Sequence, residues 1–229
     1  MIIKEKIGVC TGCGQKLAFK FGQEDFAPNV LNFDNFKKYK DIYVYECPFC
    51  GLISTDISQS GADFHAVMST PEYQAAYEYA YLKGLNETLY ENHSEGVPAN
   101  LYECFALCCK KSDPEMYVRA LNKAIQLKLI MARKYRRSQD ELGGEEENDA
   151  EYDELDALIK ASVKRNANDL LTAFTQMKEP VTFTKLIAIE TLALGKKFEQ
   201  AKIILDRVKS EQKLDADLDE YFKQMLRGN

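Results

Sequence analysis

The sequence predicts an α+β protein, mainly α, in which a small zinc-ribbon-like β module is followed by an all-helical region. Three observations carry this prediction. Residues 1–65 are poor in helical periodicity and rich in Gly, Phe, Tyr and β-branched residues. The same segment contains two CxxC motifs, and residues 66–229 repeat apolar side chains at helical spacing. We therefore expect two domains that meet near residue 65.

The first domain contains two strand-like segments on either side of a cysteine turn. The sequences IYVYE at 42–46 and GLISTDI at 51–57 are rich in β-branched and aromatic residues. We expect these segments to form two strands of the β module.

Helical periodicity begins after Thr70, which can cap a helix, at Pro71, which suits the first helical turn. Tyrosines then recur every four residues from Tyr73, so we expect a helix over 71–83 whose tyrosines pack half-buried rather than bind a ligand. Further helices are expected over 99–111, from a capping box at 112–115 to the basic run at 133–137, and over 152–177, 183–194, 198–209 and 216–226.

An acidic run separates the long helix from the next one. Residues 140–156 contain ten acidic side chains and no basic one, with two glycines among them. Because such a run repels itself and offers few apolar residues, we expect a solvated loop here, exposed and mobile at 140–149. The basic run at 133–137 complements the helix dipole, and neutralisation by the acidic loop is favoured over anion binding.

The two CxxC motifs are the most specific signal in the chain. Cys10 and Cys13 form one pair, Cys47 and Cys50 form the other, and a glycine follows each pair. Two residues between thiolates allow one tight turn to present both sulfurs to an ion at about 2.3 Å, and glycine tolerates the positive φ of that turn. Four thiolates complete a tetrahedral shell, so we expect one structural zinc ion (Zn2+) per chain. The alternatives are accidental buried thiols and thioredoxin-like redox pairs.

The remaining cysteines and the histidines are assigned to packing. Cys104, Cys108 and Cys109 lie on one expected helix among apolar residues, and we expect them to be small core side chains. The alternatives are a second metal site with His93 and a redox pair. His65 follows the β module outside the CxxC spacing and is expected to be structural rather than a metal ligand.

Composition argues against several functional classes. The chain carries 30 basic and 36 acidic residues, a net charge of -6, and residues 1–65 contain seven lysines against eight acidic residues, so nucleic acid is an unlikely partner. The N-terminus has no apolar core of a signal peptide, and no segment approaches about 18 apolar residues, so we expect a cytoplasmic protein with no membrane association. Four thiolates leave no open position on the metal, and the sequence contains no phosphate-binding Gly loop, no HExxH and no Gly-x-Ser-x-Gly, so no catalytic residues are assigned.

The segment Leu194–Val208 resembles the middle of a tetratricopeptide repeat. A glycine closes one helix, an aromatic residue and Ala201 follow on the next, and apolar residues come four and seven positions later. Together with the doubled CxxCG, the Tyr43–Pro48 lead-in and the helix end at Ala132–Arg137, this segment resembles a bacterial family of unknown function. That family joins a two-CxxC zinc-ribbon-like N-terminus to a tetratricopeptide-like C-terminus. The resemblance implies antiparallel helix pairs and brings no catalytic activity.

The expected function is that of a zinc-binding, non-enzymatic scaffold whose helical surface receives a protein or peptide partner. One alternative is a nucleic-acid-binding factor associated with transcription or translation, which would use the ribbon to contact RNA or DNA. A second alternative is an enzyme whose site carries none of the motifs searched for.

Overall fold

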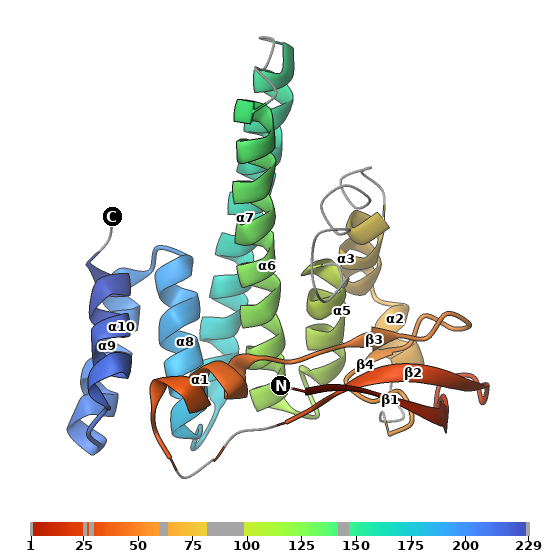
Figure 1. The fold of residues 1–229 in the computed structure, drawn as a ribbon, viewed down its shortest axis with the longest axis horizontal. Helices are drawn as coiled ribbons and strands as arrows, with labels where there is room; N and C mark the ends of the chain where they lie inside the picture. The colour runs from red at the N-terminus through yellow and green to blue at the C-terminus, as the bar shows by residue number, and fades with distance from the viewer. Residues whose placement is uncertain are drawn as a thin grey trace.

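The computed structural model describes residues 2–24, 27, 30–59, 64–81, 99–141 and 147–227. Within these ranges the protein is mainly helical, with a two-stranded antiparallel sheet at the N-terminus and a second, very short one (Figure 1). The elements follow in the order β1 (Ile2–Val9), β2 (Lys16–Gln23), α1 (Phe33–Lys40), β3 (Tyr45–Glu46), β4 (Ile53–Ser54), α2 (Phe64–Met68), α3 (Pro71–Tyr81), α5 (Ala99–Cys109), α6 (Pro114–Glu141), α7 (Glu147–Gln176), α8 (Thr182–Leu194), α9 (Phe198–Glu211) and α10 (Ala216–Leu226).

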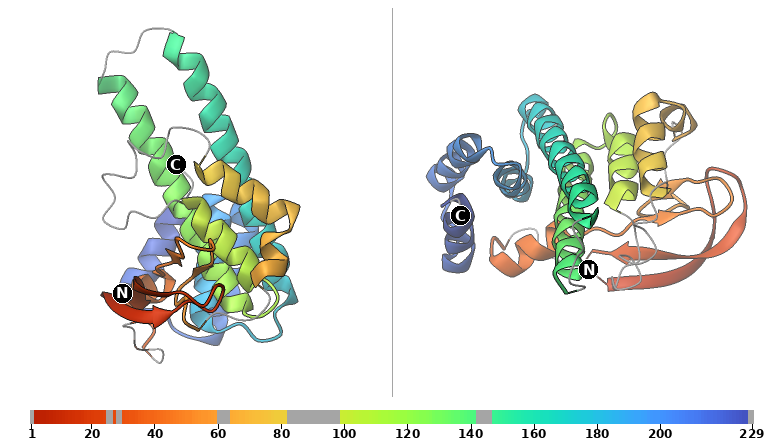
Figure 2. Two further views of the ribbon diagram at one scale, coloured as in Figure 1. Left: turned by 90° about the vertical axis from the view of Figure 1, so that its right-hand side faces the viewer. Right: turned by 90° about the horizontal axis from the view of Figure 1, so that it is seen from above.

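The antiparallel helices α6 and α7 form the centre of the molecule (Figures 1 and 2). Helix α5 packs against α6 on one side, with α3 beyond it, and α8 packs on the other side, followed by α9 and α10. The far ends of α6 and α7 project beyond the neighbouring helices. No helix in the described ranges is both long enough and apolar enough to cross a membrane.

The N-terminal β structure is an antiparallel hairpin followed by a short strand pair. Strand β1 pairs with β2 from Ile2 opposite Gln23 to Val9 opposite Lys16. The strands expected at 42–46 and 51–57 are present but are shorter, and they pair as Tyr45 opposite Ser54. One CxxC turn connects β1 to β2, and the other connects β3 to β4.

A helix interrupts the segment that we expected to be β throughout. Residues 33–40 form α1, which begins where the Asn32 side chain accepts a hydrogen bond from the backbone N–H of Asn35 at 2.8 Å. Phe36 and Tyr39 lie on its buried face and pack toward α8 and α10. The N-terminal part is therefore not a pure β module, because the insert between the CxxC motifs carries a helix of its own.

The expected helices are present, and the main correction concerns the acidic run. Helix α6 continues past the basic run to Glu141, and α7 begins at Glu147 rather than at 152. The expected solvated loop is therefore wrong for residues 140–141 and 147–151, which are helical. Acidic residues in the first turn of α7 favour the positive end of the helix dipole. Residues 142–146 lie outside the described ranges, so the expected mobility of 140–149 stays a prediction. The short helix α2 was not expected.

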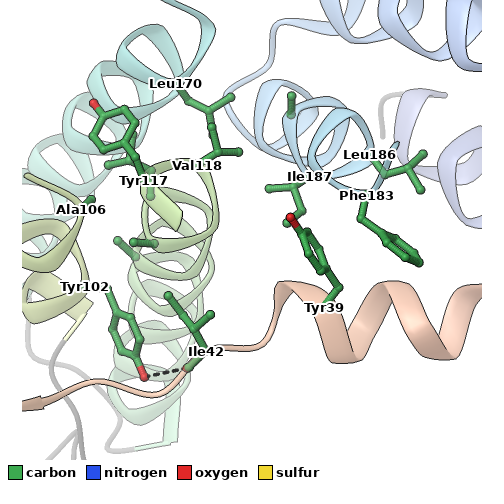
Figure 3. Close-up of a cluster of buried hydrophobic side chains, with 14 of the residues drawn as sticks. Tyr39, Ile42, Tyr102, Ala106, Tyr117, Val118, Leu170, Phe183, Leu186 and Ile187 are labelled. Carbon is green, nitrogen blue, oxygen red and sulfur yellow. Dashed lines mark hydrogen bonds between the residues drawn. The ribbon is translucent and has the colours of Figure 1, made fainter. Parts of the chain in front are cut away.

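One buried cluster contains side chains from both sides of residue 65 (Figure 3). Tyr39 of α1 stacks on Phe183 of α8 with ring centroids 5.1 Å apart. Tyr102 of α5 donates a hydrogen bond to the backbone oxygen of Ile42 at 3.2 Å. The expected boundary near residue 65 stays a prediction, and the chain on either side of it shares this core.

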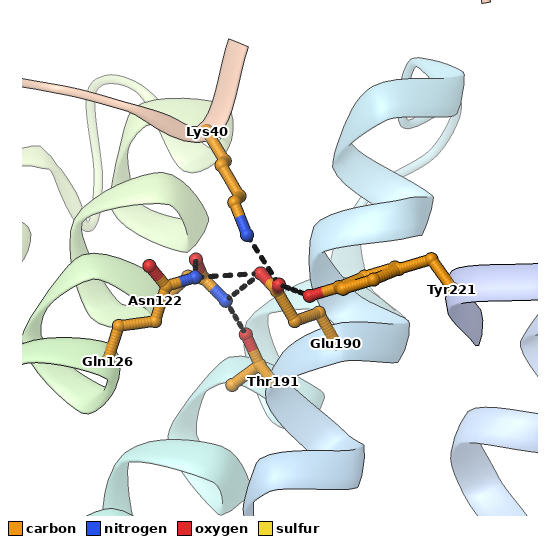
Figure 4. A network of polar contacts seen from close by, with 6 residues as sticks. All are labelled: Lys40, Asn122, Gln126, Glu190, Thr191 and Tyr221. Carbon is orange, nitrogen blue, oxygen red and sulfur yellow. Dashed lines mark hydrogen bonds and ion pairs between the residues drawn. The ribbon is translucent and has the colours of Figure 1, made fainter. Parts of the chain in front are cut away.

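A buried carboxylate joins α1 to the helical region (Figure 4). Glu190 on α8 is 2% exposed and accepts hydrogen bonds from Lys40 at 2.5 Å, Asn122 at 3.0 Å and Gln126 at 2.9 Å. The Tyr221 hydroxyl of α10 also donates to it. The charge is thus paired and fully hydrogen-bonded, which makes burial of this carboxylate tolerable.

A close helix contact explains Gly195, the residue that caps the C-terminus of α8. A Cβ placed on Gly195 would lie 2.5 Å from the Cβ of Ala167 on α7. The φ of Gly195 is −79°, whereas the next residue, Lys196, adopts the left-handed conformation with φ 59°. Glycine is therefore required at 195 by the approach of α7, and not by a positive φ.

We predict that Glu190→Ala lowers the free energy of unfolding by about 3–5 kcal/mol, because it leaves Lys40 and three polar partners without their acceptor. The exposed Glu179 provides a control, since Glu179→Ala should change stability by less than about 0.5 kcal/mol. Urea unfolding of both variants measures the difference. Equal effects in the two variants would contradict the assigned role of Glu190.

We predict that Gly195→Ala destabilises the protein by about 1–3 kcal/mol, because the new methyl group overlaps Ala167. In the double variant, Ala167→Gly removes the overlapping methyl group and should restore part of the lost stability. The recovery is incomplete because a glycine inside a helix costs roughly 1 kcal/mol. Additive effects of the two substitutions in thermal unfolding would show that the contact does not matter.

Candidate metal centre

The two CxxC motifs fold into turns with the same hydrogen bonds. In the first turn the N–H of Gly14 donates to the oxygen of Cys10 at 2.8 Å, and in the second that of Gly51 donates to Cys47 at 2.9 Å. Both glycines have positive φ, 74° and 70°, as the sequence predicted. Each turn thereby presents two sulfurs on the same side.

Different elements bring the two turns together. The first turn connects β1 to β2, and the second connects β3 to β4. The N–H of Thr11 donates to the oxygen of Ile57 at 2.9 Å, and Lys6 pairs with Asp56 at 2.5 Å. These two contacts fasten the hairpin to the chain that follows β4.

The four sulfurs lie close together, and two of their separations match those of a tetrahedral thiolate site. The Sγ atoms of Cys10 and Cys50 are 3.7 Å apart, those of Cys13 and Cys47 are 3.9 Å apart, and all four lie within 4.8 Å of one another. A tetrahedral ion with sulfur ligands at about 2.3 Å requires sulfurs about 3.8 Å apart. The group of Cys10, Cys13, Cys47 and Cys50 can therefore hold one metal ion.

Burial and backbone donors make this group favourable for a cation. The backbone N–H of Cys13 donates to the Cys10 sulfur, and those of Phe49 and Cys50 donate to Cys47. Burial raises the pKa of Cys10, and it raises that of Cys50 to about 12. At Cys47 burial also raises the pKa, but the N–H donors and neighbouring thiols outweigh it and the pKa is lowered. Four thiolates at these distances require positive charge between them.

A small apolar cluster shields one side of the sulfurs. Cys10 and Cys47 are 0% and 1% exposed and pack with Phe19, Leu52 and Ile57. Cys13 is exposed and Cys50 is half-buried. Gly12 is a close neighbour that the sequence did not single out, because a Cβ there would lie 3.0 Å from the Cys50 sulfur.

Helices α2 and α3 contact both turns. His65 lies outside the sulfur group, and its Nε2 is 3.2 Å from the oxygen of Gly12. The Tyr77 hydroxyl donates to Glu46, directly before Cys47, at 2.6 Å. The Tyr77 contact could not be predicted from the sequence, because 31 residues separate the two side chains. His65 is thus placed as a neighbour of the turn, in line with its expected structural role.

The other cysteines lie in the core, as expected. Cys104 and Cys109 are buried in the main cluster, and burial raises the pKa of Cys108 to about 11. High pKa values keep thiols protonated and unreactive. The alternative second site with His93 falls outside the described ranges.

No protein-family model, curated protein or solved structure matches this chain.

We predict that the zinc-free protein binds one Co2+ per chain and develops the absorption bands of tetrahedral thiolate coordination, because the four sulfurs are already spaced for it. Cys47→Ser should remove these bands. Cys108→Ser is the matched control and should retain them, since Cys108 lies outside the sulfur group. An octahedral cobalt spectrum, or bands that survive Cys47→Ser, would contradict the site.

Proposed function

We propose that the protein is a cytoplasmic, non-enzymatic scaffold that binds another protein or peptide, with its N-terminal part stabilised by one structural zinc ion. The observation that carries this proposal is the group of four cysteine sulfurs, which supplies a complete tetrahedral ligand set. A closed site of this kind contributes folding free energy rather than reactivity.

The donor set favours zinc over magnesium and calcium. Four soft thiolates suit zinc or iron and suit magnesium or calcium poorly. Four protein ligands also leave no position for a metal-bound water, so hydrolysis at the ion is not supported. The seven cysteines form no disulfide in the structure, which agrees with a reducing compartment.

A tetratricopeptide-like arrangement of helix pairs is the second part of the proposal. Helices α8 and α9 form an antiparallel pair with a tight turn, and Ala201 at the expected small position is fully buried. The close contact of Gly195 with α7 joins this pair to the preceding one. Stacked pairs of this kind expose broad surfaces that bind peptides or helices.

Nucleic acid is the less favoured partner because most of the described aromatic residues of the N-terminal part are buried or half-buried. Phe19, Phe36 and Tyr39 are 1%, 0% and 6% exposed, whereas Phe49 is 64% exposed. Single-stranded nucleic acid needs several aromatic platforms along a basic groove. Together with the net charge of -6, this favours a protein partner.

We predict that the zinc-loaded full-length protein, carrying a photoreactive cross-linker in its source cell, captures a protein partner in a nuclease-resistant complex. Removing zinc should reduce capture, because the N-terminal part loses its shape. Capture of RNA or DNA instead, with binding that falls steeply as salt rises, would establish the nucleic-acid alternative. A reaction abolished by one substitution that leaves the fold intact would establish an enzyme.

A further inference from the structure

We propose that the free edge of β1 binds an extended acidic peptide segment of a partner protein, which adds to the hairpin as a third strand. This inference rests on the proposed function, in which the protein engages another protein, and it names the surface and the chemistry of the partner. It rests on three observations, namely an open strand edge, exposed apolar side chains and local positive charge.

Within the described part of the chain, the backbone groups along the outer edge of β1 have no strand partner. In an antiparallel pair, successive residues face alternately toward and away from the neighbouring strand. The N–H of Cys10 donates to Gln15 at 2.9 Å, toward the β2 side, whereas that of Thr11 points away and donates to Ile57 at 2.9 Å. By this alternation the odd-numbered residues Ile3 and Ile7 point their backbone groups away from β2.

No other described segment pairs with β1 along residues 3–7. The sheet contains β1 and β2 alone within the described part of the chain, so β1 is an edge strand (Figures 1 and 2). The Thr11–Ile57 bond closes the edge at the end near the cysteines. An open edge of this length is a template for strand addition unless something covers it.

The same residues expose large apolar side chains. Ile3, Ile7 and Val9 are 40%, 70% and 52% exposed. Ile7 lies opposite Ala18 and Ile3 lies opposite Gly22, and these small residues give little cover. The same face also carries Glu5 opposite Lys20, and Val9 lies opposite Lys16. Apolar side chains gathered on one strand face mark an interaction surface better than the same residues scattered singly.

The hairpin is locally basic in an acidic protein. Residues 2–23 contain four lysines and one glutamate, a net charge of +3, whereas the whole chain carries -6. Lys6 is paired with Asp56, whereas Lys4 is exposed on the face opposite Ile3 and Ile7. The exposed Lys16 and Lys20 belong to β2 and lie on the same face as Ile3 and Ile7. A second copy of the chain would bring an equally basic hairpin to this edge, so self-pairing is disfavoured and an acidic strand is favoured.

The geometry also sets the sequence pattern of the partner. A strand added beside β1 would place alternate side chains next to Ile3 and Ile7 on one face, and the others next to Lys4 on the opposite face. The preferred segment therefore alternates apolar and acidic residues.

The test titrates the zinc-loaded full-length protein with a capped eight-residue peptide in which valine alternates with glutamate, followed by NMR. We expect saturable binding, amide shifts concentrated at Ile3, Glu5 and Ile7, and slowed exchange of these amides. A peptide alternating valine with lysine should bind at least tenfold more weakly. Shifts on the helices, equal binding of the two peptides, or no binding at about 1 mM would overturn the proposal.

Matched variants distinguish binding at the β1 edge from effects of substituting any exposed apolar residue. Ile7→Glu should weaken peptide binding at least tenfold, and Ile203→Glu should leave it unchanged, although Ile203 on α9 is equally exposed at 69%. Glu5→Pro removes a backbone N–H that points away from β2, so it leaves the hydrogen bonds between β1 and β2 intact. It should abolish binding, although the loss of a negative charge would by itself favour an acidic peptide. Retained zinc content shows that each variant is folded, and unchanged binding by folded Glu5→Pro would exclude strand addition.

Two further outcomes would replace the partner that we propose. Amide shifts at β1 that grow with protein concentration alone would indicate pairing with a second copy, and stronger binding of single-stranded RNA than of peptide would indicate nucleic acid. Failure at this edge leaves the proposed function standing if cross-linking still captures a protein through another surface. Capture of no protein at all would overturn the proposed function itself.

Discussion

The convergence of four cysteine sulfurs within 4.8 Å is the constraint on which the N-terminal structure depends. Neither CxxC turn has a large apolar core of its own, and the strands β3 and β4 contain two residues each. Four thiolates at this spacing repel one another unless a cation lies between them. The hairpin, the short strand pair and their contacts with α2 and α3 therefore meet at a group of sulfurs that could hold one metal ion.

The insert between the two turns extends this constraint to the helical region. Its helix α1 docks on α8 and α10 through Phe36 and Tyr39, and Lys40 reaches the buried carboxylate of Glu190. The segment from Lys40 to Cys47 is thus held at one end by the Glu190 network and at the other end by the sulfur group. Loss of either would release chain that also contributes Ile42 and Val44 to the main core.

The sequence predicted the two CxxC turns and most helices, whose signals lie close together in the chain, but it did not predict the β1–β2 hairpin or the short helices α1 and α2. The CxxCG spacing predicted the group of four cysteines and the positive φ of both glycines, and apolar periodicity located most helices. The signal for α1 was present in the Asn32 cap and the spacing of Phe33, Phe36 and Tyr39, but the aromatic composition favoured strands. The role of Gly195 against Ala167 could not be predicted, because it depends on how two distant helices pack. The start of α7 is not evident from composition, because a run of acidic residues is as typical of a solvated loop as of a helix N-terminus.

The central claim is that the four sulfurs hold one zinc ion whose role is structural. X-ray absorption and elemental analysis of protein purified from its source, without added metal, test it most directly. The account predicts one zinc per chain with four sulfur neighbours at about 2.3 Å, and loss of the β-hairpin amide protection when the ion is removed. Iron in place of zinc, a nitrogen or oxygen ligand on the ion, or a hairpin that stays protected without metal would contradict it.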